Sequence, residues 1–136
     1  MKNLIAGSLF ILMSVCAPAY AQEVETKTWE QVYQKECATL ADIKVWLDND
    51  TDVQHLVLLQ PDEQLTPIIK DVLSEHIPMT EELYNSISKF VWLINPLTDK
   101  VFVIPFNNDG CFLKHNVMVA PNGEFQLEID RKLVKQ

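Results

Sequence analysis

Apolar residues in the first two thirds of the chain recur every three or four positions, the spacing of one face of an α-helix. The first such stretch runs from residue 29 to at least 41, and Thr28 precedes it as a capping residue. The second begins with Thr66 at the cap and Pro67 at the first helical position, where a missing N–H costs nothing. Thr80 caps a third, shorter stretch. The sequence therefore predicts three helices.

Short apolar runs bounded by turn residues predict strands in the rest of the chain. One lies at 53–60, and four more follow at 90–95, 101–107, 111–119 and 124–130. The pairs Asp109-Gly110 and Asn122-Gly123 are typical of hairpin turns. In the last run Phe125, Leu127 and Ile129 alternate with polar residues. The strands after residue 89 are therefore expected to form an antiparallel meander.

Together these elements predict an α+β domain in which N-terminal helices pack on a C-terminal antiparallel four- to five-stranded meander sheet. The run 90–95 is apolar on both faces, with Phe90 and Trp92 on one and Val91 and Leu93 on the other. Both faces should therefore be covered. We expect two layers, in which the second face of the sheet is partly exposed to solvent. The alternatives are that a remaining helix or a partner chain covers this second face. Pro105 predicts a sheet edge or a bulge, because it has no N–H to donate.

The first 21 residues have the layout of a secretory signal peptide. Lys2 is followed by an apolar run at 4–15, and cleavage is predicted after Ala21. The apolar run is too short to span a membrane. Acylation of Cys16 in a lipoprotein is the alternative, although Val15 stands where a small residue is preferred. We therefore expect residues 22–136 to form one periplasmic or secreted domain without a membrane span.

The predicted exported chain is acidic, with 10 basic and 19 acidic residues and a net charge of −9. The excess lies in residues 22–88, which hold 14 acidic and 4 basic residues. Such a surface repels nucleic acid and favours a basic protein partner. The candidate contact surface combines acidic residues with one aromatic residue: Asp48, Asp50, Asp52, Asp62, Glu63 and Phe106.

Cys37 and Cys111 are the two cysteines outside the predicted signal peptide. An even number of cysteines in an exported domain predicts a disulfide, and two cysteines allow one pairing. Two buried thiols, or one reactive thiol, are the alternatives.

The segment DNDTD at 48–52 spaces its aspartates like the start of a calcium-binding loop. Such a loop needs glycine at its sixth position and glutamate at its twelfth, where this chain has Val53 and Leu59. We therefore interpret the segment as an acidic turn between a helix and a strand, with a weak, non-standard cation site as the alternative, and we predict neither a metal site nor a cofactor.

Candidate catalytic groups are sparse. The histidines, His55, His76 and His115, lie far apart and have no cysteine or histidine at ligand spacing. A Cys111–His115 dyad would place its members about 13 Å apart along a strand, too far for a hydrogen bond. No phosphate-binding or nucleophile motif occurs, so we predict no catalytic residues.

Three functional hypotheses follow. The first is an exported, non-enzymatic binding protein, such as an inhibitor, an immunity protein or an accessory factor. The second is a structural component of an envelope assembly that uses a sheet edge near Pro105 and forms a homo-oligomer. The third is an enzyme that depends on a thiol or a metal.

Overall fold

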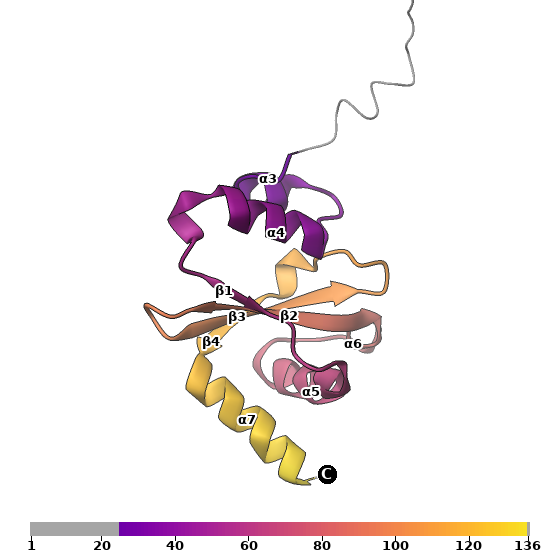
Figure 1. Ribbon diagram of the computed structural model, residues 1–136. Helices are drawn as coiled ribbons and strands as arrows, with labels where there is room; N and C mark the ends of the chain where they lie inside the picture. The colour runs from indigo at the N-terminus through magenta and orange to yellow at the C-terminus, as the bar shows by residue number, and fades with distance from the viewer. Residues whose placement is uncertain (1–24, 136) are drawn as a thin grey trace, which may run out of the picture.

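The computed structural model describes residues 25–135, so the predicted signal peptide and Cys16 lie outside the described residues. A four-stranded sheet stands at the centre, with helices above and below it (Figure 1). The helices are α3 (Trp29–Gln34), α4 (Leu40–Asn49), α5 (Thr66–His76), α6 (Glu81–Ser86) and α7 (Asn122–Lys135). Two short 3₁₀ turns, η1 (Thr51–Val53) and η2 (Glu63–Leu65), lie between helices and the first strand, and a third, η3 (Lys114–Asn116), lies between the last two strands. None of the helices within residues 25–135 combines the length and the apolar character needed to cross a membrane.

The sheet is an antiparallel meander in the order β1-β2-β3-β4. Its strands are β1 (Val57–Leu59), β2 (Ile87–Asn95), β3 (Lys100–Asn107) and β4 (Met118–Pro121). Trp92 at the centre of β2 is paired with Leu59 on one side and Val103 on the other. The predicted α+β class, with helices before an antiparallel meander, is confirmed.

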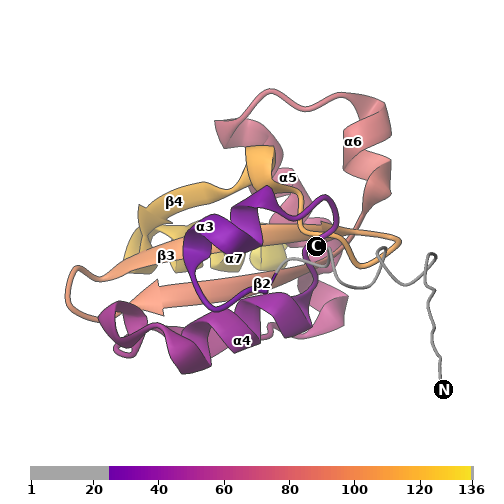
Figure 2. The same ribbon diagram turned by 90° about the horizontal axis from the view of Figure 1, so that it is seen from above.

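Helices of this chain cover both faces of the sheet. Figure 1 shows α3 and α4 above the sheet, and Figure 2 shows them in front of it, with α4 running roughly along β2. Their core contains Ile43 and Trp46 of α4 packed with the β2 residues Val91 and Leu93. On the opposite face α5 and α7 pack against a core that includes Trp92 of β2. The predicted division of β2 into two apolar faces is confirmed, but the expected two-layer arrangement is wrong because the sheet lies between two helical layers.

The first helix is interrupted. Thr28 caps α3 as predicted and accepts a hydrogen bond from the backbone N–H of Gln31. The predicted single helix over 29–41 is wrong, because α3 ends at Gln34 and a new helix starts after Thr39. Thr39 forms a capping box with Asp42, which gives the chain a fresh helix start. The break leaves Cys37 in a loop between two helices.

The later helix starts agree closely with the sequence. Thr80 caps α6 by accepting a hydrogen bond from Leu83 N–H. Pro67 lies in the first turn of α5 as predicted, but Thr66 is the first helical residue and not a side-chain cap.

Residues 124–130 form part of α7, so the predicted strand and the predicted Asn122-Gly123 hairpin are wrong. Phe125 and Ile129 are fully buried, whereas Leu127 between them is 52% exposed. Burial at positions i and i+4, but not at i+2, is the pattern of a helix. The helix is favoured over the strand because it packs Phe125 against Trp92, with ring centroids 5.5 Å apart.

The predicted strand at 111–119 is also only partly correct, since η3 interrupts it and β4 starts at Met118. Before η3 the segment pairs with β3 only through the single bridge Phe106–Phe112. Pro105 lies at this gap, where its carbonyl accepts a hydrogen bond from Leu113 N–H. Pro105 is buried, so the open sheet edge expected there is covered by residues 111–113.

The predicted disulfide is confirmed. Cys37 and Cys111 are bonded, with Cα atoms 4.9 Å apart. Gly110, at a φ of +82°, closes the predicted turn just before Cys111 in a left-handed conformation that suits glycine. The bridge fastens the loop between α3 and α4 to the end of the β3 turn.

Candidate functional site

An apolar groove lies where α3 and α4 leave part of the sheet uncovered. Its volume is about 440 Å³, within the range of ligand-binding clefts. The groove is lined from the sheet, from the two helices and from the segments around η1 and η3: Trp29, Trp46, Val53, His55, Leu56, Leu93, Asn95, Phe102, Ile104, Lys114, Val117 and Val119. Most of these side chains are hydrophobic, so the groove can bury an apolar ligand.

Three large apolar side chains at the groove remain open to solvent. Trp29 is 37% exposed, Phe102 36% and Val119 52%. They come from α3, β3 and β4, and they converge because Phe102 and Val119 are paired in the sheet and Trp29 lines the same groove. Apolar surface gathered in a concave site is more informative than single exposed residues scattered over a protein.

The helical wall of the groove is an aromatic cluster. The ring of Trp29 lies 4.8 Å from that of Trp46 and 5.8 Å from that of Phe112, measured between centroids. Trp46 is nearly buried, and its indole N–H donates a 3.0 Å hydrogen bond to Asp50. This hydrogen bond holds the Trp46 ring in place. Trp29 is the ring of the cluster that remains accessible to solvent.

Polar groups lie at the rim of the groove. His55 and Asn95 line it from the β1 and β2 side, and Lys114 lines it from η3. The ammonium group of Lys114 donates a 2.7 Å hydrogen bond to the Tyr33 carbonyl and lies 4.8 Å above the Tyr33 ring. Lys114 therefore also ties η3 to α3.

The acidic segment 48–52 follows directly from the groove wall. Asp50 ends α4 and caps η1, accepting from Asp52 N–H at 3.0 Å as well as from Trp46. Asp48 and Asp52 are exposed. As interpreted, DNDTD joins a helix to a strand, but Asp48 and Asn49 still belong to α4 and the turn itself is Asp50 with η1. Within residues 25–135, no three His, Cys, Asp or Glu side chains are grouped so as to hold a metal ion.

The structure separates the other predicted contact residues. Asp62 and Glu63 are exposed at η2, after β1, and Asp62 accepts a hydrogen bond from Gln64 N–H. Phe106 is fully buried under α3 and α4, so it does not belong to an exposed surface. The alternation of side chains along β3 places Phe106 on the face of the sheet that α3 and α4 cover.

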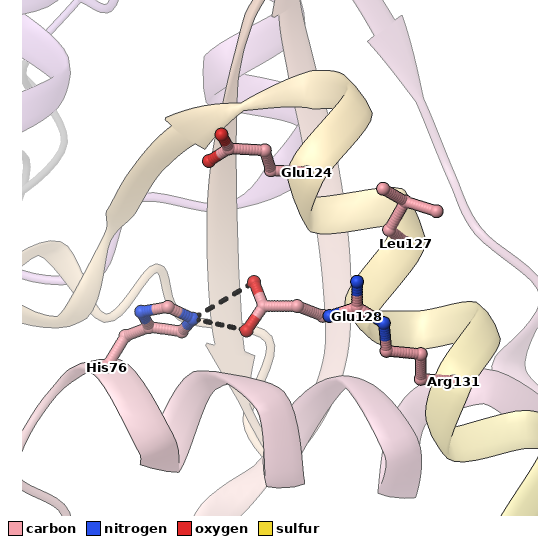
Figure 3. A pocket seen from close by; sticks show the side chains of 5 residues that line it. All are labelled: His76, Glu124, Leu127, Glu128 and Arg131. Carbon is pink, nitrogen blue, oxygen red and sulfur yellow. Dashed lines mark hydrogen bonds and ion pairs between the residues drawn. The ribbon is translucent and has the colours of Figure 1, made fainter.

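A second, more polar hollow of about 490 Å³ lies between α5 and α7. Figure 3 shows His76 of α5 facing Glu128 of α7, with Glu124, Leu127 and Arg131 around them. His76 Nε2 lies 2.8 and 3.1 Å from the two Glu128 oxygens. The pair joins α5 to α7.

The perturbed titratable groups lie outside both hollows. Burial raises the pKa of Asp42, but hydrogen bonds from Thr39 and Lys35 outweigh it and hold that pKa below its usual value. The hydrogen bond from Tyr84 to Asp71, 2.7 Å long, raises the pKa of Tyr84 to about 12, and burial adds to the rise. Both groups stabilise the fold.

The histidines and the cysteines do not come together as a catalytic dyad. Cys111 is bonded to Cys37, and His115 packs edge-on against Tyr33 with centroids 6.3 Å apart. The groove was not predicted from the sequence. Trp29 and Phe102 have ordinary core spacing, and the pattern of the chain does not show which of them the helices leave open.

The chain matches no protein-family model, and neither the curated proteins nor the solved structures contain a significant match to it.

Proposed function

We propose that this protein is an exported, non-enzymatic binding protein whose apolar groove takes a hydrophobic segment of a partner protein. The carrying observation is the convergence of Trp29, Phe102 and Val119, partly exposed, in one concave site. In a folded domain with two complete cores, leaving these side chains open has no benefit for stability. Their exposure is explained if another molecule covers them.

Charge supports a basic partner. Asp52 is exposed next to the groove residue Val53, Asp48 is exposed on α4, and the N-terminal half carries most of the negative charge. A partner segment with lysine or arginine next to its apolar residues would meet both surfaces. Opposite charges at the rim of an interface speed association and fix its orientation.

The disulfide supports an oxidising compartment, in agreement with the periplasmic or secreted location expected from the first 21 residues. The alternative role, as an envelope component using the edge near Pro105, has less support because Pro105 is buried.

Selection of peptides from a random library on the immobilised protein tests the proposal. We expect the enriched peptides to combine apolar or aromatic residues with lysine or arginine. Substitution of Val119→Asp should reduce their affinity at least tenfold, because it places a charge in the groove. The matched control is Leu97→Asp, since Leu97 is 77% exposed in the turn after β2 and lies outside the groove.

The acidic contribution is tested separately with the variant Asp48→Asn/Asp52→Asn. We expect it to weaken binding and to flatten the dependence of affinity on salt. Equal binding by wild type, Val119→Asp and Leu97→Asp would show that the groove is not the site. Peptides without basic residues would contradict the charge argument alone.

A further inference from the structure

The C-terminal helix α7 carries an apolar stripe that faces solvent. Leu127 is 52% exposed and Val134 is 86% exposed. At about 100° per residue these two positions lie on the side of the helix opposite Phe125 and Ile129, which face the core. The stripe therefore has no cover among residues 25–135.

The stripe contains a shallow hollow with the spacing used in coiled coils. Its lining is Leu127, Asp130, Arg131, Val134 and Lys135. The first four stand at positions i, i+3, i+4 and i+7, the four residues that surround each inserted side chain in knobs-into-holes packing. The surface thus fits another helix better than it fits a flat partner.

Charges flank this stripe in a self-complementary way. Asp130 lies on one side of it, and Arg131 and Lys135 lie on the other. Arg131 forms no hydrogen bond or ion pair with the described part of the chain. Asp130 accepts one surface hydrogen bond, from the Gln126 side chain at 3.0 Å. Neither side chain has to break a buried hydrogen bond or ion pair in order to contact a second chain.

We propose that α7 binds α7 of a second copy of this chain, with the two helices side by side and parallel. A twofold axis along the helices brings Asp130 of each copy next to Arg131 and Lys135 of the other. It also stacks Leu127 on Leu127 and Val134 on Val134. An antiparallel pair would place the two Asp130 side chains together, so the charges select the parallel arrangement.

The contact is small and its ion pairs are exposed, so the dimer is weak and forms at high protein concentration. This surface is separate from the groove, which lies on the other face of the sheet. Self-association through α7 is therefore independent of what the groove binds.

Sedimentation equilibrium over a wide concentration range tests the pairing. The mean mass of the wild type should rise from one chain toward two. Asp130→Arg alone and Arg131→Asp alone should each keep the mass at one chain, because each places like charges across the contact. The exposed Glu36→Arg is the matched control and should behave as the wild type.

Complementation makes the test specific. An equimolar mixture of the Asp130→Arg and Arg131→Asp proteins should regain the two-chain mass, and so should the double variant that carries both changes. A wild type that stays at one chain throughout would overturn the proposal. So would single variants that associate as well as the wild type, or a double variant that fails while the mixture succeeds, which would indicate an antiparallel pair.

Discussion

The backbone N–H of Phe112 donates a 2.6 Å hydrogen bond to the carbonyl of Ala38. Each of these residues directly follows one cysteine of the disulfide. The aromatic contact between Trp29 and Phe112 lies beside this bond. The layer of α3 and α4 is therefore fastened to the end of β3 by a covalent bond, a backbone hydrogen bond and ring packing at one place.

Removal of the disulfide should lower stability substantially. Cys37 and Cys111 are 74 residues apart, and closing a loop of this length stabilises the folded state by roughly 4 kcal/mol in the loop-entropy description. We expect Cys37→Ala/Cys111→Ala to lose about that free energy of unfolding in urea. Reduction of the wild type should give a similar loss. A loss below about 1 kcal/mol in both would show that the neighbouring contacts hold the layer without the bond.

The helical form of α7 predicts unequal effects at two neighbouring apolar positions. Phe125→Ala should cost about 3–5 kcal/mol, because it empties a fully buried site against Trp92. Leu127→Ala should change the free energy of unfolding by less than about 0.5 kcal/mol, because Leu127 is half exposed. Thermal unfolding followed by circular dichroism measures both. Equal losses would fit a strand, in which the two side chains share one face.

Asp42 should make stability fall in acid. It accepts hydrogen bonds from Thr39 N–H at 2.7 Å and from Lys35 at 2.9 Å. These bonds keep its pKa below the usual 3.8, so the carboxylate contributes stability that is present above pH 3.8 and lost as pH falls through the lowered pKa. We expect Asp42→Asn to cost about 1 kcal/mol at neutral pH and to differ less from wild type in acid.

Denaturant unfolding of wild type and Asp42→Asn between neutral pH and strong acid measures this convergence. Asp48→Asn, in the same helix but exposed, is the control and should stay within about 0.5 kcal/mol of wild type at neutral pH. A constant gap between wild type and Asp42→Asn at all pH values would contradict the account.

Tyr84 should resist alkaline ionisation. Its hydroxyl donates to Asp71 at 2.7 Å, which raises its pKa from 10 to about 12. The neutral phenol is the favoured form, so its contribution to stability is complete below pH 10 and is lost as pH rises through about 12. Ultraviolet titration of phenolate should show a late step that Tyr84→Phe lacks. Asp71→Asn should move that step toward lower pH, and an unchanged step would assign the shift to another cause.

Helix-capping residues, the alternation of apolar residues in strands and the number of cysteines predict much of the fold. Thr28 and Thr80 cap helices where the sequence places them, because a side-chain oxygen that accepts a nearby N–H is a local property. The two faces of β2 follow from its alternation, and the disulfide follows from the number of cysteines. Each of these features depends on few residues close together in sequence, or on one possible pairing.

The errors arose where a local pattern allowed two answers. Phe125, Leu127 and Ile129 alternate over seven residues, but Phe125, Ile129 and Leu133 also stand four apart, and tertiary packing selected the helix. The box of Thr39 and Asp42 was a sequence signal for the break before α4, hidden by the continuing spacing of Cys37 and Leu40. The groove depends on how far α4 extends across the sheet, which no local pattern specifies.

The packing of α3 and α4 also sets an order of events during synthesis. Three of their hydrophobic partners, Leu93, Ile104 and Phe112, lie at least 44 residues further along the chain than Asn49, the last residue of α4. Contacts over such distances must be closed against chain entropy before they stabilise anything. The helices α3 and α4 are therefore synthesised first but are among the last elements to pack. Their core is incomplete until Phe112 has been synthesised.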